Sequence, residues 1–170
     1  MDEFIIIKQK LEISVDGVLL QIQRIKDEYR LSNEAVDFDE KWKYNVQRIN
    51  DENSLKNLLK ISIDGLKELN IYIQEFEEIF EELSNNKSIK DLRDMFEHEV
   101  EYLQGNGHQQ KRFIDKNTLL TASETGITET DYLIGGRLKL SYIEEIFNEI
   151  KRILQNNNFT FTIEGIMKLK

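Results

Sequence analysis

The feature that most constrains this fold is a series of long apolar stripes at helical spacing in a chain that contains no proline. In the first stripe an apolar residue recurs every three or four positions: Phe4, Ile7, Leu11, Val15, Val18, Ile22, Ile25 and Tyr29. This spacing places the side chains on one face of an α-helix. Because no Pro interrupts the chain, such helices can run long without a forced kink.

Further stripes predict further helices. A short one covers 38–50 and carries Phe38, Trp42, Val46 and Ile49. The polar run 51–54 then offers N-cap residues for a new helix that reaches about Ser84. Ser88 with Asp91, and Ser141 with Glu144, resemble the capping boxes that start helices. Short polar linkers favour antiparallel neighbours, so we predict a mainly α protein, an antiparallel bundle of long helices.

The stretch from 105 to 140 differs from the rest of the chain. Thr and Gly become common there, and the helical period fades. Gly135-Gly136 lies between two apolar triplets, which predicts a small β-hairpin with a two-residue turn. We therefore expect a β-hairpin or irregular insert around 118–140. The tail 159–163 alternates with a period of two and suggests a short strand.

Length and composition bound the class of protein. The chain of 170 residues predicts one domain spanning 1–170. The net charge of −9 disfavours a broad nucleic-acid-binding face and an anionic membrane surface. The absence of Cys excludes disulfides, thiolate metal sites and cysteine nucleophiles. No apolar run is long enough for a membrane span, and the acidic N-terminus does not read as a signal peptide, so we expect a cytoplasmic protein.

One short motif carries candidate chemistry. Arg93-Asp94-Met95-Phe96-Glu97-His98 places a His five residues after an Arg within a helical stripe. His titrates near neutral pH and can exchange protons, whereas Arg keeps its charge and offers a planar donor fork for phosphate. Asp94, His98 and Tyr102 follow at four-residue spacing and share one helix face. At about 100° per residue, Arg93 and His98 lie about 140° apart on a straight helix.

This motif resembles the signature of the HEPN superfamily, helical bundles that include metal-independent ribonucleases of toxin–antitoxin and phage-defence systems. The signature is an Arg, usually followed by a polar residue, and a His four to six residues after the Arg; Arg93, Asp94 and His98 match it. The resemblance implies a homodimer in which Arg93 and His98 are catalytic, Asp94 and Tyr102 support them, and no cofactor or metal takes part. In some toxins of the family a Tyr lies two residues after the His, where this chain has Val100.

Two further groups of residues outside the motif are candidates for contacts. The basic residues Lys111, Arg112 and Lys116 are candidate RNA contacts, although a solvated loop explains them as well. Trp42 and Tyr44 read as core or interface aromatics rather than as base-stacking platforms.

The alternative function is a non-catalytic helical module that binds a protein partner, with a degenerate motif. A carboxylate-rich metal bundle is a weaker third reading, because no second His accompanies His98 at helical spacing.

Overall fold

The computed structural model describes residues 2–97, 126–128, 131–156 and 159–169. These residues form six α-helices, one 3-10 helix and three short strands, so the prediction of a mainly α protein with a small β insert is confirmed. They divide into two compact units, one of Met1–Phe80 with Phe147–Lys170 and one of Glu81–Ile146. No helix of the described part is long and apolar enough to cross a membrane.

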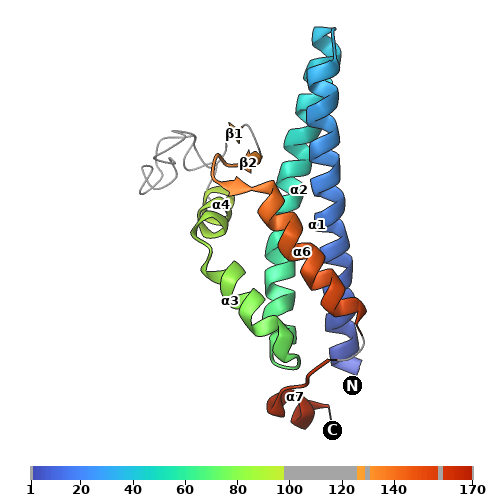
Figure 1. Ribbon diagram of the computed structural model, residues 1–170, viewed down its shortest axis with the longest axis vertical. Coiled ribbons are helices and arrows are strands. Elements are labelled where there is room, and N and C mark those ends of the chain that lie inside the picture. The colour runs from blue at the N-terminus through green and yellow to red at the C-terminus, as the bar shows by residue number, and fades with distance from the viewer. Residues whose placement is uncertain (1, 98–125, 129–130, 157–158, 170) are drawn as a thin grey trace. The chain divides into compact units, whose positions relative to one another are not determined.

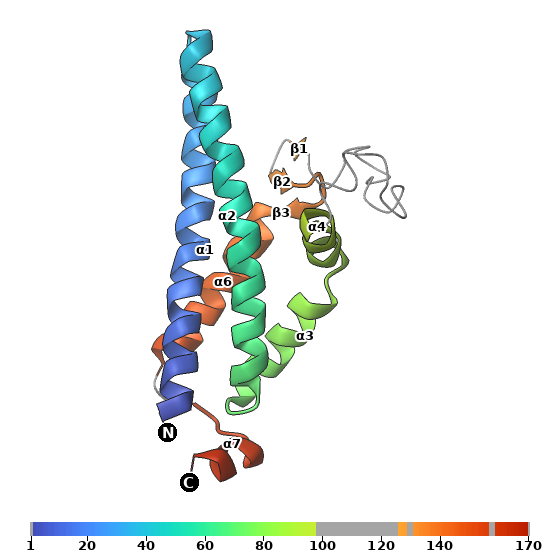
Figure 2. The ribbon, with the colours of Figure 1, turned by 180° about the vertical axis from the view of Figure 1, so that it is seen from behind.

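The first unit is built on two long antiparallel helices, α1 (Asp2–Glu34) and α2 (Phe38–Asn70), which lie side by side in Figures 1 and 2. The apolar stripe of the first thirty residues is buried between them, as its spacing predicts. The Leu58 side chain of α2 packs against the α1 backbone at Gly17, where an added Cβ would lie 3.2 Å from it. The buried residues of this interface include Leu11, Val15, Val18, Ile22, Ile25, Leu55, Leu59, Leu66 and Leu69.

The predicted helix start at 51–54 is wrong, because α2 runs unbroken through these residues. Asp51 and Glu52 are buried and pair with arginines, Asp51 with Arg24 of α1 and Glu52 with Arg48 of α2 itself, instead of capping a helix end. A run of N-cap residues marks a boundary only if the preceding turn leaves the helix. Here α2 continues because Asp51 begins the buried face that Leu55, Leu59, Ser62, Leu66 and Leu69 carry on at helical spacing.

The predicted helix to Ser84 is also wrong, since α2 ends at Asn70. The chain turns through 71–73 into η1 (Gln74–Phe76) and then α3 (Glu77–Asn85). The C-terminal segment pairs with this turn: Ile73 bridges Phe161, and the Thr162 N–H donates to the Tyr72 carbonyl at 2.9 Å. This long-range pairing satisfies the backbone groups that a continuing helix would have used.

The tail forms that single β-bridge in place of the suggested strand, and α7 (Ile163–Lys168) begins directly after it. Thr162 caps α7 by accepting the Gly165 N–H at 2.9 Å. Only Gly fits at position 165, because a Cβ there would lie 2.6 Å from the Cα of Tyr72. The Phe4 ring packs against Tyr72 and Phe161, with centroids 5.5 and 5.8 Å apart.

The second unit contains α4 (Lys87–Glu97) and an antiparallel sheet of β1 (Gly126–Ile127), β2 (Tyr132–Ile134) and β3 (Leu138–Lys139), in the order β1-β2-β3. The hairpin at Gly135-Gly136 is confirmed, but Ile134 pairs with Leu138, so its loop has three residues and not two. Both glycines have positive φ, 59° and 64°, a conformation that side chains resist. The helix α6 (Leu140–Gln155) follows β3 directly.

The helix starts are close to the predicted ones, although the caps differ. For α4 the side-chain oxygen of Asn86 accepts the Ile89 N–H at 3.2 Å, and Asp91 serves elsewhere. At the start of α6, Asp131 accepts hydrogen bonds from the Ser141 N–H and hydroxyl. Sequence spacing locates a helix start, but other nearby polar groups compete for the same donors.

Candidate functional site

The candidate catalytic Arg93 lies on α4 and is half exposed. Its guanidinium Nη2 is 3.7 Å from Asp94 Oδ1, an ion pair between adjacent residues. Leu92 and Met95 are buried on the inner face of the same helix. The apolar period of α4 therefore turns Arg93 outward, where a guanidinium remains available to a phosphate.

A buried ion pair holds the motif helix. Arg137 Nη1 lies 2.9 Å from Asp91 Oδ2, with 6% and 3% of the two side chains exposed. Arg137 follows the glycine pair of the hairpin loop, and its Nε donates to the Gly135 carbonyl at 3.2 Å. Removing either charge would leave the other buried without its partner, which is costly. The glycine loop thus positions a cation against α4, two residues before Arg93.

A network of side-chain hydrogen bonds fixes the start of α4. The Tyr142 hydroxyl donates to Glu82 Oε1 at 2.9 Å and accepts from the Asn86 amide at 3.2 Å. Burial and the neighbouring Glu82 raise the pKa of Tyr142, while the hydrogen bond from Asn86 opposes them. Because Asn86 also caps α4, this hydrogen-bond network connects the first turn of the motif helix to α6.

The other sequence-predicted site residues lie outside the described residues. They are His98, Tyr102, Lys111, Arg112 and Lys116. Their catalytic, supporting and RNA-contact roles stay predictions. Asp94, predicted to support the catalytic pair, contacts Arg93 in the part of the chain that the structure describes.

The first unit holds a charged cluster that sequence reasoning missed. In the turn half of the hairpin, defined here as 24–34 of α1 and 38–52 of α2, the carboxyls of Glu28, Asp51 and Glu52 are buried. Arg24 Nε lies 3.0 Å from Asp51 Oδ2, and Arg48 Nε lies 3.6 Å from Glu52 Oε1. Glu28 also shares a hydrogen bond with Asp51, so two carboxyl groups meet across the helix interface.

A signal for this cluster is present in the sequence. Glu28 lies three residues after the buried Ile25, and Asp51 lies four residues before the buried Leu55. Both are charged residues at the spacing of the core stripe. A charged residue at such a position is buried only if it finds partners, and the opposite helix supplies them.

The turn half also carries exposed apolar side chains on its outer surface. Trp42 is 62% exposed, which excludes a core position for it within the described structure, whereas Tyr44 is half-buried. The remaining members of this outer stripe, Val36, Phe38, Val46 and Ile49, are exposed as well. Phe38, Trp42, Val46 and Ile49 share one helix face, and an exposed apolar face of this kind is typical of interaction sites.

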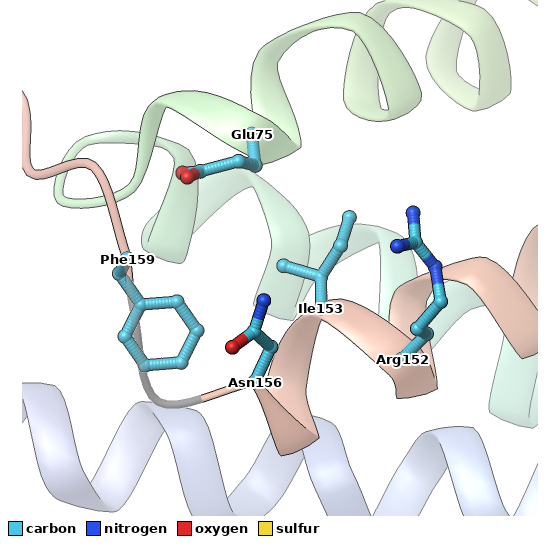
Figure 3. Close-up of a pocket in the computed structure, with 5 residues that line it drawn as sticks. All are labelled: Glu75, Arg152, Ile153, Asn156 and Phe159. Atoms are coloured by element: carbon cyan, nitrogen blue, oxygen red, sulfur yellow. The ribbon is translucent and has the colours of Figure 1, made fainter.

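Figure 3 shows a cavity of about 120 Å³ lined by Glu75, Arg152, Ile153, Asn156 and Phe159. Its charged groups face neighbours on the chain: Glu75 accepts the Thr160 N–H at 2.9 Å, and Arg152 pairs with Glu149 at 3.2 Å. Burial acts to raise the pKa of Glu75, but backbone N–H donors outweigh it, and the pKa is lowered. This arrangement stabilises the C-terminal segment and suggests no reaction.

Comparison with known proteins does not place the chain in a family. No family model, curated protein or solved structure matches it.

Proposed function

We propose that the chain is a HEPN-like, metal-independent endoribonuclease in which Arg93 and His98 carry the reaction. The observation that supports the proposal is the exposed Arg93 beside Asp94 on α4, five residues before His98 in the sequence. The buried Asp91–Arg137 pair gives that helix a fixed place in its unit. Asp94 and Tyr102 would support the reacting pair, and Lys111, Arg112 and Lys116 are candidate contacts to the RNA backbone.

The proposed reaction needs only these residue types. A base removes the proton of the ribose 2′-hydroxyl, whose oxygen attacks the adjacent phosphorus and displaces the 5′-oxygen, which an acid protonates. His98 exchanges these protons near neutral pH. Arg93 stabilises the additional negative charge on the phosphorane oxygens. The products are a 2′,3′-cyclic phosphate and a free 5′-hydroxyl, so no oxidant and no metal is required.

The helical spacing favours a site made by two chains. On one straight helix Arg93 and His98 lie about 140° apart. A second copy of the motif helix, related by two-fold symmetry, would supply the missing group from the opposite side. We therefore propose a homodimer. A role as a toxin or in phage defence, with an antitoxin as partner, follows from the resemblance.

The test is RNA cleavage in EDTA by wild type, Arg93→Ala and His98→Ala, after circular dichroism shows all three folded. Matched controls are Arg30→Ala, an exposed helical Arg, and His108→Ala, the other histidine. We expect the two motif variants to lose about 100-fold or more in rate, as for a lost proton-transfer group, and the controls to keep it. Equal cleavage by all five proteins would place the activity outside the motif.

A second candidate function is a non-catalytic module that binds a protein partner through the outer stripe of the turn half. The observation that favours it is the exposed Trp42 within that stripe. It predicts that a partner isolated from the native cells is lost with Trp42→Ala and kept with His98→Ala. Ile13→Ala, at an equally exposed apolar position on α1, is the matched control and should also keep the partner.

A further inference from the structure

Three buried carboxyl groups meet two guanidinium groups in the turn half of the α1–α2 hairpin. Glu28 is 8% exposed, Asp51 5% and Glu52 4%. Arg24 approaches from α1 and Arg48 from α2. With both groups ionised, Glu28 and Asp51 would place two negative charges at buried carboxyls beside the single, half-exposed guanidinium of Arg24, an excess of negative charge. Such an excess is unfavourable unless a proton neutralises one carboxyl.

The contact between Glu28 and Asp51 identifies where that proton is held. A hydrogen bond between two carboxyl groups requires that one of them be protonated, because two carboxylates are both acceptors. In the described structure Glu28 Oε2 is buried without a hydrogen-bond partner, whereas Asp51 receives the Arg24 guanidinium. Glu28 is therefore the better site for the proton.

We propose that the Glu28–Asp51 carboxyl pair is a pH-sensitive latch that closes the turn half of the hairpin while it holds one proton and loosens it when that proton is lost. One carboxyl comes from each helix, so the shared proton joins α1 to α2. Loss of this proton leaves two facing carboxylates, which repel each other where the protonated pair attracted. The other charged groups of the cluster are Arg24, Arg48 and Glu52. The latch is independent of the proposed ribonuclease activity.

The titration of Glu28 places this change near neutral pH. Burial raises its pKa, the hydrogen bond and charge of Asp51 raise it further, and Arg24 and Arg48 oppose them, which brings the pKa to about 7. In the unfolded chain the same group would titrate near 4.5. Between these values the folded state binds more protons, so stability falls as the pH rises from about 4.5 to 7.

The chain contains its own reporter, since Trp42 is the only tryptophan and lies in the turn half. The experiment is urea unfolding followed by Trp42 fluorescence between pH 5 and pH 8. The proteins are wild type, Glu28→Gln, which mimics the protonated carboxyl, and Glu34→Gln, an exposed control on the same helix. We expect the equilibrium constant of unfolding to rise about tenfold or more from pH 5 to pH 8 in wild type and in Glu34→Gln, relative to its change in Glu28→Gln.

Parallel pH profiles for wild type and Glu28→Gln would overturn the latch. A second measurement does not depend on how the variants fold. Carbon-13 NMR of the wild-type Glu28 carboxyl should show a titration midpoint near 7. A midpoint near the ordinary value of 4.5 would also overturn the proposal.

Discussion

The two halves of the α1–α2 hairpin use the same helix geometry but different chemistry. In the base half, 7–22 of α1 and 55–69 of α2, the interface is almost entirely apolar, with a single buried hydroxyl pair, Ser14 and Ser62, at 2.9 Å. In the turn half Ile25 is still buried, but Glu28, Asp51 and Glu52 occupy the neighbouring buried positions beside two guanidinium groups. The turn half also contains a hydrogen bond between the side chains of Ser32 and Asn45, at 3.3 Å.

This difference teaches that helical period determines which residues face each other, but not what holds them together. Apolar burial stabilises the base half at any pH. The ionic turn half depends on the protonation of Glu28, and it depends on salt because Arg24 is half exposed to water. The turn half also exposes Trp42 on its outer surface. We infer that the hairpin has a stable base and a weaker, condition-dependent end.

The largest effect should come from breaking the base half. Leu66 is fully buried, so Leu66→Ala removes apolar contacts and leaves a cavity. We expect a loss of about 2–5 kcal/mol in the free energy of unfolding, measured by urea denaturation. Ile61→Ala, at an exposed position of the same helix, should cost far less. Equal losses would mean that the base half is not the apolar core.

Breaking the turn half should cost less. Asp51→Ala deprives Arg24 and Glu28 of a partner, but Arg24 is half exposed and water replaces part of the interaction. We expect a loss of roughly 1–2 kcal/mol in the free energy of unfolding, smaller in high salt. The control is Asp27→Ala, which removes a half-exposed carboxylate from the turn of α1 that carries Glu28. A loss as large as that of Leu66→Ala would contradict the comparison.

The hydroxyl pair of the base half offers a sharper test. Ser62 donates to Ser14, and Ser14 donates to the Leu11 carbonyl. Ser62→Ala should cost less than about 1 kcal/mol, since Ser14 keeps its own acceptor. Replacing both serines by Ala should be close to neutral, as measured by the midpoint of thermal unfolding. A large loss in the double variant would show that the base half also depends on a polar contact.

The smallest effect is expected at the surface. Lys151 Nζ lies 2.7 Å from Asp16 Oδ1, but both side chains are well exposed. Lys151→Ala should change the free energy of unfolding by no more than about 0.5 kcal/mol in urea denaturation. A larger change would mean that this pair acts with further groups and that exposure is a poor guide to the strength of ion pairs in the hairpin.

Much of the fold could be predicted from the sequence because apolar period is a local signal. It predicted α1, the hairpin at Gly135-Gly136 and the helix that follows. The end of α2 could not be predicted in this way, because the segment that pairs with the turn after it, where Phe161 bridges Ile73, lies far along the chain. Asp51 misled for a related reason, since its partner Arg24 can be recognised only once the two helices are paired.

The candidate site divides along the same line. Arg93 was identified from its spacing to His98, and its exposure on α4 agrees with the amphipathic pattern of that helix. Arg137, which anchors the helix through Asp91, carries no local signal beyond the two glycines before it. A long-range ion pair needs a fold before it can be recognised.

Native-state hydrogen exchange, residue by residue, tests most directly whether the hairpin has one stability or two. At pH 8 we expect amides in 24–32 and 44–52 to open with a lower free energy than amides in 11–18 and 58–66, and to approach them at pH 5. Uniform protection along both helices at both pH values would contradict the account.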